Sequence, residues 1–148
     1  SLVTFAATEG AEMRFIELMP LGPGAHRHDE EFFSADDALA RLQAAGGLLG
    51  PLPSSSTAER HQFERDGRPV VVGFIRSVSH PFCERCDRLR LDSRGRLRPC
   101  LRGEYAVDLA ERMAVGEDAV AEAVQRVVAQ KCHPADRWPD LSMTRIGG

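Results

Sequence analysis

The sequence predicts an α/β chain in which a helix and a strand are followed by antiparallel hairpins. Residues 2–9 have a helical pattern that ends at Gly10, and residues 13–19 then predict a strand. A helix followed by a strand is typical of a slice through a repeating βα barrel or a doubly wound sheet. Residues 61–76 and 88–101 each place turn residues between two strand-like runs, which predicts two antiparallel hairpins.

The segment between the strand and the first hairpin predicts a loop, a helix and a linker. Glycine and proline at residues 22–24 open the loop. Ser34, with Asp37 three residues later, resembles a helix start, and Gly46-Gly47 ends that helix. Prolines and serines over residues 51–56 predict a linker.

The two hairpins and the last helix have definite signals. Asp66-Gly67 is the expected turn of the first hairpin, and the apolar run at residues 70–75 is its buried second strand. The second hairpin is expected to turn through residues 93–96. A final amphipathic helix has Glu117 in its first turn and an apolar face made of Val120, Val124, Val127 and Val128.

The composition is that of an ordinary globular protein. Of the 148 residues, 43% are hydrophobic and 28% are charged, and the net charge is −3. No apolar run approaches the roughly 20 residues that span a membrane, and no secretion signal is visible. We therefore expect a cytoplasmic protein without a membrane partner. The chain begins with Ser1 in a helix-like stretch, which predicts a cut inside a larger protein.

The positive charge of the chain consists almost wholly of arginine. Lys131 is the only lysine among the 19 cationic residues. Two explanations are open: biased genomic base composition, or planar bidentate recognition of phosphate and carboxylate groups.

Cysteine spacing predicts a metal site. Cys83 and Cys86 form a CxxC motif, which in a chain without a secretion signal indicates a metal or redox site. A hairpin that turns near residues 94–95 would place Leu89 opposite Cys100, so that a third sulfur lies at the base of the CxxC loop. The expected ligands are therefore Cys83, Cys86 and Cys100.

The kind of metal stays open at this point. Structural zinc needs a fourth protein ligand, such as Cys132 or a histidine, whereas an iron–sulfur cubane can be held by three cysteines. His26 and His28 form a His-x-His pair, which we interpret as solvated loop histidines. Cys132 is interpreted as an ordinary thiol at the end of the last helix.

Two arginines lie beside the predicted metal site. Arg88 and Arg90 are two residues apart on the expected strand, so their side chains leave the same face. Cations beside a metal centre are costly unless an anion lies between or above them. They either face solvent or hold a polyphosphate ligand over the site.

Three segments together resemble the C-terminal part of GTP 3′,8-cyclases, radical S-adenosylmethionine enzymes of molybdenum cofactor biosynthesis. Residues 81–90 (PFCERCDRLR) with Cys100, which thirteen residues separate from the CxxC motif, are similar to that family's second cluster motif. Residues 14–20 (RFIELMP) resemble its last barrel strand, and residues 143–148 (MTRIGG) resemble its double-glycine tail.

The resemblance implies a role for each matching residue. Cys83, Cys86 and Cys100 would hold a [4Fe-4S] cluster with one iron open to GTP. The segment of Arg88, Leu89 and Arg90 would contact GTP, and Met19 would contact S-adenosylmethionine. The catalytic tail residues would be Gly147 and Gly148.

The resemblance also implies the fold and the partners. Residues 1–22 would be the last helix and strand of an incomplete TIM-type βα barrel, and residues 23–148 an α+β cluster-binding extension with antiparallel hairpins and the double-glycine tail. The CxxxCxxC motif of the radical cluster does not occur in this sequence, so the chain is predicted to be inactive alone. Expected partners are GTP, the N-terminal radical half on the same or another chain, a second copy, and, by pathway, cyclic pyranopterin monophosphate synthase.

Two other classes of function compete with this one. A zinc-ribbon module could use its arginines to bind nucleic acid, but the acidic net charge and the single Trp and single Tyr count against it. A purely structural remnant would keep the fold without a ligand.

Overall fold

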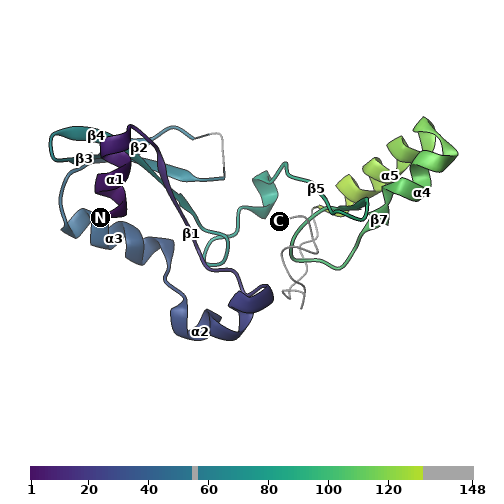
Figure 1. Ribbon diagram of the computed structural model, residues 1–148, viewed down its shortest axis with the longest axis horizontal. Coiled ribbons are helices and arrows are strands. Elements are labelled where there is room, and N and C mark those ends of the chain that lie inside the picture. Colours follow the sequence, from purple (N-terminus) through teal and green to yellow (C-terminus); the bar gives the residue numbers. More distant parts are fainter. Residues whose placement is uncertain (55–56, 132–148) are drawn as a thin grey trace. The chain divides into compact units, whose positions relative to one another are not determined.

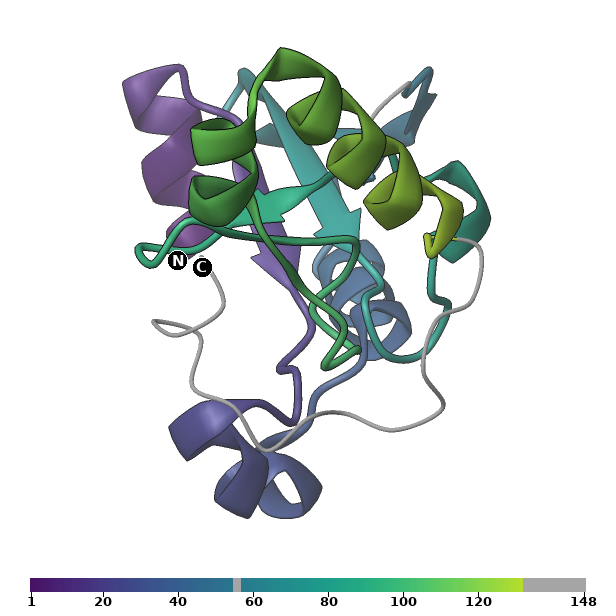
Figure 2. The same ribbon diagram turned by 90° about the vertical axis from the view of Figure 1, so that its right-hand side faces the viewer.

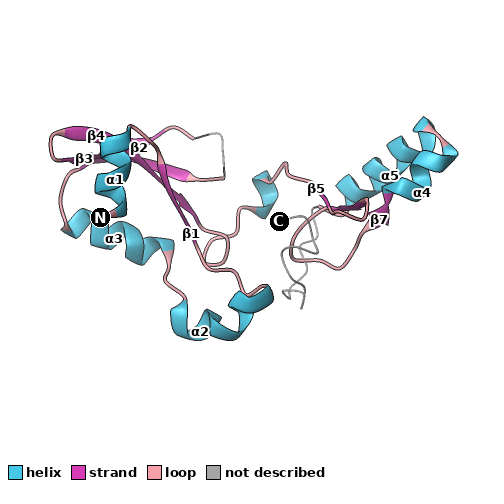
Figure 3. Cartoon of the chain, in the orientation of Figure 1, coloured by secondary structure: helices cyan, strands magenta, loops and turns pink. Residues whose placement is uncertain are grey.

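The computed structural model describes residues 1–54 and 57–131, which form two compact units. Unit 1 consists of Ser1–Met19 and His28–Phe82, and unit 2 of Pro20–Arg27 and the described residues from Cys83 onward. Both units mix helices with antiparallel strand pairs, so the predicted α/β class with antiparallel hairpins is confirmed (Figures 1 and 3). The expected division at residues 22 and 23 concerns the parts of a longer enzyme and stays a prediction.

Unit 1 is a four-stranded sheet of order β1-β4-β3-β2 with helices packed on one face. Its strands are β1 (Met13–Ile16), β2 (Leu48–Leu52), β3 (Glu59–Arg65) and β4 (Arg68–Ile75), and its helices are α1 (Leu2–Glu9), α2 (His28–Glu31) and α3 (Ala35–Ala44). Strand β1 pairs in parallel with β4, and the other two pairs are antiparallel.

The core of unit 1 lies between the sheet and two helices. Alternate residues of a strand point to the same face of the sheet, so β3 and β4 each bury one row of side chains on that face. Helices α1 and α3 cover this row with small residues, which lets the helices approach the sheet closely. The buried cluster consists of Val3, Ala6, Ala7, Ala35, Phe63, Val70, Val72 and Phe74.

Most predicted elements of unit 1 are confirmed. Helix α1 ends at Gly10, whose φ of 64° is a left-handed value that glycine adopts without steric cost. Ser34 caps α3 by accepting a hydrogen bond from the amide of Asp37. The hairpin of β3 and β4 turns at Asp66-Gly67, where both residues have positive φ as in a type I′ turn.

Three expectations for unit 1 and its neighbourhood are wrong. Strand β1 ends at Ile16 instead of residue 19. The expected linker over residues 51–56 begins inside β2, because Pro51 lies on an edge strand, where a proline is tolerated. The expected loop after Gly22 contains two short helices, the 3-10 helix η1 (Gly22–Arg27) and α2.

Unit 2 is a three-stranded antiparallel sheet beside a helical hairpin. The sheet order is β5-β6-β7, with β5 at Arg90–Leu91, β6 at Arg96–Arg98 and β7 at Val107–Asp108. Helices α4 (Leu109–Val115) and α5 (Glu117–Ala129) lie side by side (Figure 2). The predicted final helix is therefore confirmed, and α4 was not predicted.

The apolar interior of unit 2 is small. Helix α5 packs on β6 through Ala123 and Val127, and Leu97 is the buried apolar residue of the strand. Among the described residues, no helix is long and apolar enough to cross a membrane.

Candidate functional site

A buried aspartate organises the hairpin that follows the cysteine loop. Asp92 accepts hydrogen bonds from the amides of Arg94 (2.9 Å) and Arg96 (3.0 Å) and from the Arg96 guanidinium (2.9 Å). Burial alone would raise the pKa of Asp92, but these donors lower it below its ordinary value. The carboxylate thus fixes the turn between β5 and β6 in its charged form.

The register of this hairpin differs by one residue from the expected register. Arg90 pairs with Arg98 and Leu91 with Leu97, and the Asp92 amide donates to the Arg96 carbonyl. The loop therefore has three residues, and its last residue, Gly95, has a φ of 78°. Continued along both arms, this register places Arg88, not Leu89, opposite Cys100. The expected Leu89–Cys100 pairing is wrong because the turn type was not visible from the sequence.

The three candidate cysteines are free, half-buried thiols. Cys83 begins the short 3-10 helix η2 (Cys83–Arg85), and the Cys86 amide donates to the Cys83 carbonyl at 3.2 Å. At the far arm of the hairpin, the Arg102 amide donates to the Cys100 sulfur at 3.4 Å. The structure therefore places two thiols on one short turn and the third at the end of the opposing arm.

Cations surround the Cys86 thiol. Burial alone would raise the pKa of Cys86, but the Arg88 amide and the Lys131 ammonium lower it below its ordinary value of 9.0. Lys131 Nζ lies 3.7 Å from the Cys86 sulfur. A thiolate is the form of cysteine that binds metals, so this environment suits a metal ligand.

The arginine pair lies within electrostatic reach of the thiols. Burial and the neighbouring Arg88 lower the pKa of Arg90, whereas Cys100 and Cys86 act to raise it. Arg90 begins β5, while Arg88 precedes the strand and is exposed, so the expectation that both stand on one strand is wrong. The structure nevertheless brings Arg88, Arg90, Cys86 and Cys100 into one neighbourhood.

The chemistry of the three candidate thiols suits a thiolate-bound metal centre. Three free thiols beside cationic side chains match the ligands of an iron–sulfur cluster. Within residues 1–54 and 57–131, however, no group of three or more Cys, His, Asp or Glu side chains is already gathered as a metal site. The convergence of all three sulfurs stays a prediction.

The sequence analysis did not identify two basic residues of this neighbourhood. Arg98 is 4% exposed and donates to the Glu104 carbonyl at 3.2 Å, with its Nε 3.9 Å from the Asp92 carboxylate. The Lys131 ammonium donates to the carbonyls of Arg88 and Pro99 as well as to Cys86. The one available signal was that Lys131 is the only lysine of the chain.

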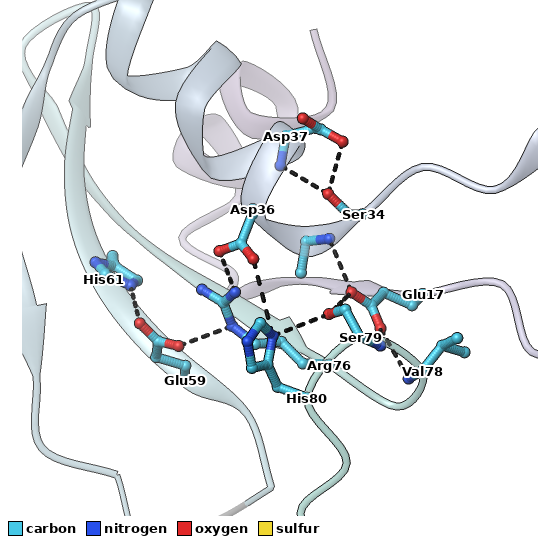
Figure 4. A network of polar contacts seen from close by, with 11 residues as sticks. Glu17, Ser34, Asp36, Asp37, Glu59, His61, Arg76, Val78, Ser79 and His80 are labelled. Atoms are coloured by element: carbon cyan, nitrogen blue, oxygen red, sulfur yellow. Dashed lines mark hydrogen bonds and ion pairs between the residues drawn. The ribbon is translucent and has the colours of Figure 1, made fainter.

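Unit 1 contains a second buried carboxylate that the sequence analysis missed. Glu17 is 3% exposed and accepts hydrogen bonds from the amides of Ala35 (3.0 Å), Val78 (2.8 Å) and Ser79 (2.8 Å), and from the Ser79 hydroxyl (Figure 4). Burial alone would raise the pKa of Glu17, but these donors lower it. Glu17, which lies two residues before Met19, thereby joins the segment after β1 to the start of α3 and to the segment after β4.

An ion-pair chain lies beside Glu17 (Figure 4). The Arg76 guanidinium binds Asp36 of α3 and Glu59 of β3, and the Glu59 carboxylate accepts a hydrogen bond from the His61 Nε2 at 3.0 Å. Burial acts to lower the pKa of Arg76, but its two carboxylate partners raise it. These contacts hold the helix against the ends of the strands and have a structural role.

The remaining candidates are Met19, two histidines and three residues near the C-terminal end of the chain. Met19 is half-buried at the end of the first segment of unit 1. His26 is exposed on η1, whereas His28 is half-buried on α2 with its ring tilted against Phe32 at 5.0 Å between centroids, so the expectation of a solvated loop histidine is wrong for His28. Cys132, Gly147 and Gly148 lie outside the described residues.

The fold is that of a mixed α/β protein in which a CxxC loop leads into a hairpin that carries a third cysteine and is flanked by arginines. The chain belongs to the family described as Molybdenum Cofactor Synthesis C, whose sequence model matches residues 11–136. This confirms the resemblance to the C-terminal portion of GTP 3′,8-cyclases.

Individual relatives agree with the family. The chain is 35% identical to a GTP 3′,8-cyclase of Rhodopirellula baltica over 99% of its own length and 44% of the relative. It is 35% identical to one of Heliobacterium modesticaldum, over 92% of the chain and 44% of that protein. A Pseudomonas entomophila GTP 3′,8-cyclase is 38% identical over 87% of the chain and 40% of its own length. The chain thus spans less than half the length of these curated relatives.

Proposed function

We propose that this chain is the C-terminal iron–sulfur and GTP-binding part of a GTP 3′,8-cyclase. Such an enzyme converts GTP to 3′,8-cyclo-7,8-dihydro-GTP by radical chemistry in molybdenum cofactor biosynthesis. The observation that carries the proposal is the shared neighbourhood of Arg88, Arg90, Cys86 and Cys100 on one hairpin. The names of the relatives supply the substrate, GTP.

Cys83, Cys86 and Cys100 would hold a [4Fe-4S] cluster. Their thiols are free and half-buried, and cations next to Cys86 favour the thiolate. A cubane bound by three cysteines would leave one iron open to the GTP. This property distinguishes the proposed site from structural zinc, which is closed by four protein ligands.

Arg88 and Arg90, with the backbone at Leu89, would bind the GTP. The two guanidiniums lie close enough to lower the pKa of Arg90, so they repel each other. A triphosphate between them would replace that repulsion with charge-assisted hydrogen bonds, which are about twice as strong as neutral ones. The hairpin thereby orients the nucleotide relative to the cluster.

The other residues would act with the remainder of the enzyme. Helix α1 and the parallel-paired strand β1 would be the last elements of the TIM-type barrel, with Met19 in contact with S-adenosylmethionine. Gly147 and Gly148 would enter the active site, where glycine lets backbone approach a ligand closely. The proposed setting is cytoplasmic. Without a radical cluster of its own, this chain alone would not cleave S-adenosylmethionine.

Anaerobic reconstitution with iron and sulfide tests the proposal. We expect about four irons per chain and the broad absorbance of an iron–sulfur cluster. In the Cys83→Ala, Cys86→Ala and Cys100→Ala variants, the cluster should be lost. One tightly bound zinc per chain, retained in place of iron, would instead establish the zinc-ribbon alternative.

The nucleotide role is tested on the same reconstituted chain. The double variant Arg88→Ala and Arg90→Ala should keep its iron but bind GTP at least roughly 100-fold more weakly, because two charge-assisted contacts are lost. Arg94→Ala with Arg112→Ala, which removes two exposed arginines of the same unit, is the matched control. Equal GTP affinity in both double variants would contradict the assigned role.

A further inference from the structure

We propose that Lys131 is a positioning residue that clamps the two arms of the β5–β6 hairpin beside Cys86 and so holds the cysteine ligands in place for cluster uptake. The link to cluster uptake rests on the proposed function, whereas the clamp itself rests on contacts within unit 2.

The contacts of Lys131 match its donor capacity. Its ammonium donates to the carbonyl oxygen of Arg88, lies 3.4 Å from the carbonyl oxygen of Pro99 and 3.7 Å from the Cys86 sulfur. An ammonium group has three N–H donors. The described residues therefore place as many acceptors around Lys131 as the number of hydrogen bonds that it can donate.

The clamp lies where the strand pairing ends. The last paired residues at this end of the hairpin are Arg90 and Arg98. The next residue on the second arm, Pro99, has no amide hydrogen. Beyond the last pair, Lys131 donates to one carbonyl on each arm, that of Arg88 and that of Pro99.

Lys131 is itself held at a fixed point. The last turn of α5 is anchored by Val127, which is 0% exposed. The Gln130 amide donates to the Val127 carbonyl, and the Lys131 amide donates to the Val128 carbonyl at 3.0 Å. The contact between the ammonium and Cys86 therefore fixes the cysteine loop relative to α5.

The residue type supports the same role. Every other cation of the chain is an arginine, yet this position carries the only lysine. Arginine presents a planar fork that suits two parallel acceptors, whereas an ammonium directs three donors to acceptors that diverge. The Cys86 sulfur and the Arg88 carbonyl on one chain segment, and the Pro99 carbonyl on another, are acceptors of the second kind.

The first test uses the metal-free chain. Lys131→Met keeps most of the aliphatic stem and removes the donors, while Arg126→Met, the matched control, removes an exposed cation from α5, the helix that ends just before Lys131. We expect amide exchange over residues 86–90 and 98–102 to rise about fivefold or more in Lys131→Met, since the hydrogen bonds across the arms are lost. Arg126→Met should exchange like the unaltered chain.

The second test uses the reconstituted chain. Iron should be lost to a chelator roughly tenfold faster from Lys131→Met than from Arg126→Met, and Lys131→Arg should recover only part of the difference. Equal exchange in the two methionine variants would overturn the clamp. Raised exchange with unchanged iron retention would overturn its role toward the cluster.

The two proposals fail in different ways. If the unaltered chain binds no iron, the proposed function fails, and the exchange measurement still decides whether Lys131 clamps the hairpin. If the unaltered chain binds four irons and Lys131→Met equals its control in both measurements, only the inference about Lys131 fails.

Discussion

Unit 1 and unit 2 are stabilised in different ways. Unit 1 buries an apolar cluster of eight residues between one sheet face and two helices. In unit 2 the described buried apolar residues are Leu21, Leu97, Ala123 and Val127, and they are joined by the buried Asp92 and Arg98. Hydrophobic burial is the main driving force of folding. Unit 1 therefore has a core of its own, whereas unit 2 depends more on polar contacts and, in our proposal, on a metal cluster.

Each unit nevertheless contains one buried carboxylate that is fully supplied with donors. Glu17 binds three amides and a hydroxyl in unit 1, and Asp92 binds two amides and a guanidinium in unit 2. A buried charge is tolerated only when it is paired and hydrogen-bonded. The difference between the units therefore lies in the amount of apolar burial, not in the presence of buried charge.

The largest expected effect tests the difference in apolar burial. Phe74 is 0% exposed and packs against Phe15 and His61, so Phe74→Ala should destabilise unit 1 by about 3–5 kcal/mol. Leu97→Ala should destabilise unit 2 by only about 2 kcal/mol, since fewer apolar residues are buried in the described part of unit 2. Amide exchange measured separately over β4 and β6 gives both values. An equal loss of stability in Leu97→Ala and Phe74→Ala would contradict the difference in apolar burial between the two units.

A smaller effect is expected for the buried carboxylate of unit 1. Glu17→Gln keeps the shape but replaces a charged acceptor with a group that brings an NH₂ toward backbone donors. We expect a loss of about 2–3 kcal/mol, measured by urea unfolding. Glu9→Gln, which alters an exposed carboxylate at the end of α1, should change stability by less than about 0.5 kcal/mol. Equal stability of the two variants would show that the Glu17 contacts contribute nothing.

The smallest expected effect is the response to acid, which compares the two carboxylates directly. The pKa of each is lower in the folded chain than its ordinary value, 4.5 for Glu17 and 3.8 for Asp92. The unfolded chain therefore binds protons at a higher pH than the folded chain does. The stabilisation that each carboxylate contributes is present above its ordinary pKa and is lost as the pH falls through its pKa in the folded chain.

We accordingly expect the protection of unit 1 amides to begin to fall below pH 4.5 and that of unit 2 amides below pH 3.8. Glu17→Gln should reduce the acid dependence of unit 1 but not abolish it, because the pKa of Glu12 is also lowered: burial raises it, but Arg14 and Arg60 outweigh this. Asp92→Asn should reduce the dependence of unit 2. Unchanged acid profiles in both variants would contradict the pairing described here.

Local signals predicted the elements that they alone control. The turn at Asp66-Gly67 needs two residues that accept positive φ, and the cap at Ser34 needs a side-chain acceptor beside the first helical amides. The linker over residues 51–56 was mispredicted because Pro51 is acceptable on an edge strand, and only the sheet order shows which strand is an edge.

The candidate site was predicted only in part, for a similar reason. The CxxC motif, Cys100 and the arginine pair are visible in the sequence because their spacing is local or falls on one hairpin. The register of that hairpin was off by one residue, since it depends on the three-residue loop that Asp92 and Gly95 form. The sequence did not indicate that Arg98 is buried, because its residue type does not distinguish it from the other arginines of this arginine-rich chain.

The sequence by itself determined the class of fold, the thiols, the neighbouring cations and the family resemblance, because these depend on residue identity and short spacings. Tertiary structure alone decided that Glu17 receives amides from residues 18, 61 and 62 positions away, and that Lys131 reaches back 45 residues to Cys86. A buried charge or an ammonium clamp is defined by its acceptors and donors in space. Those partners come together only when distant segments pack.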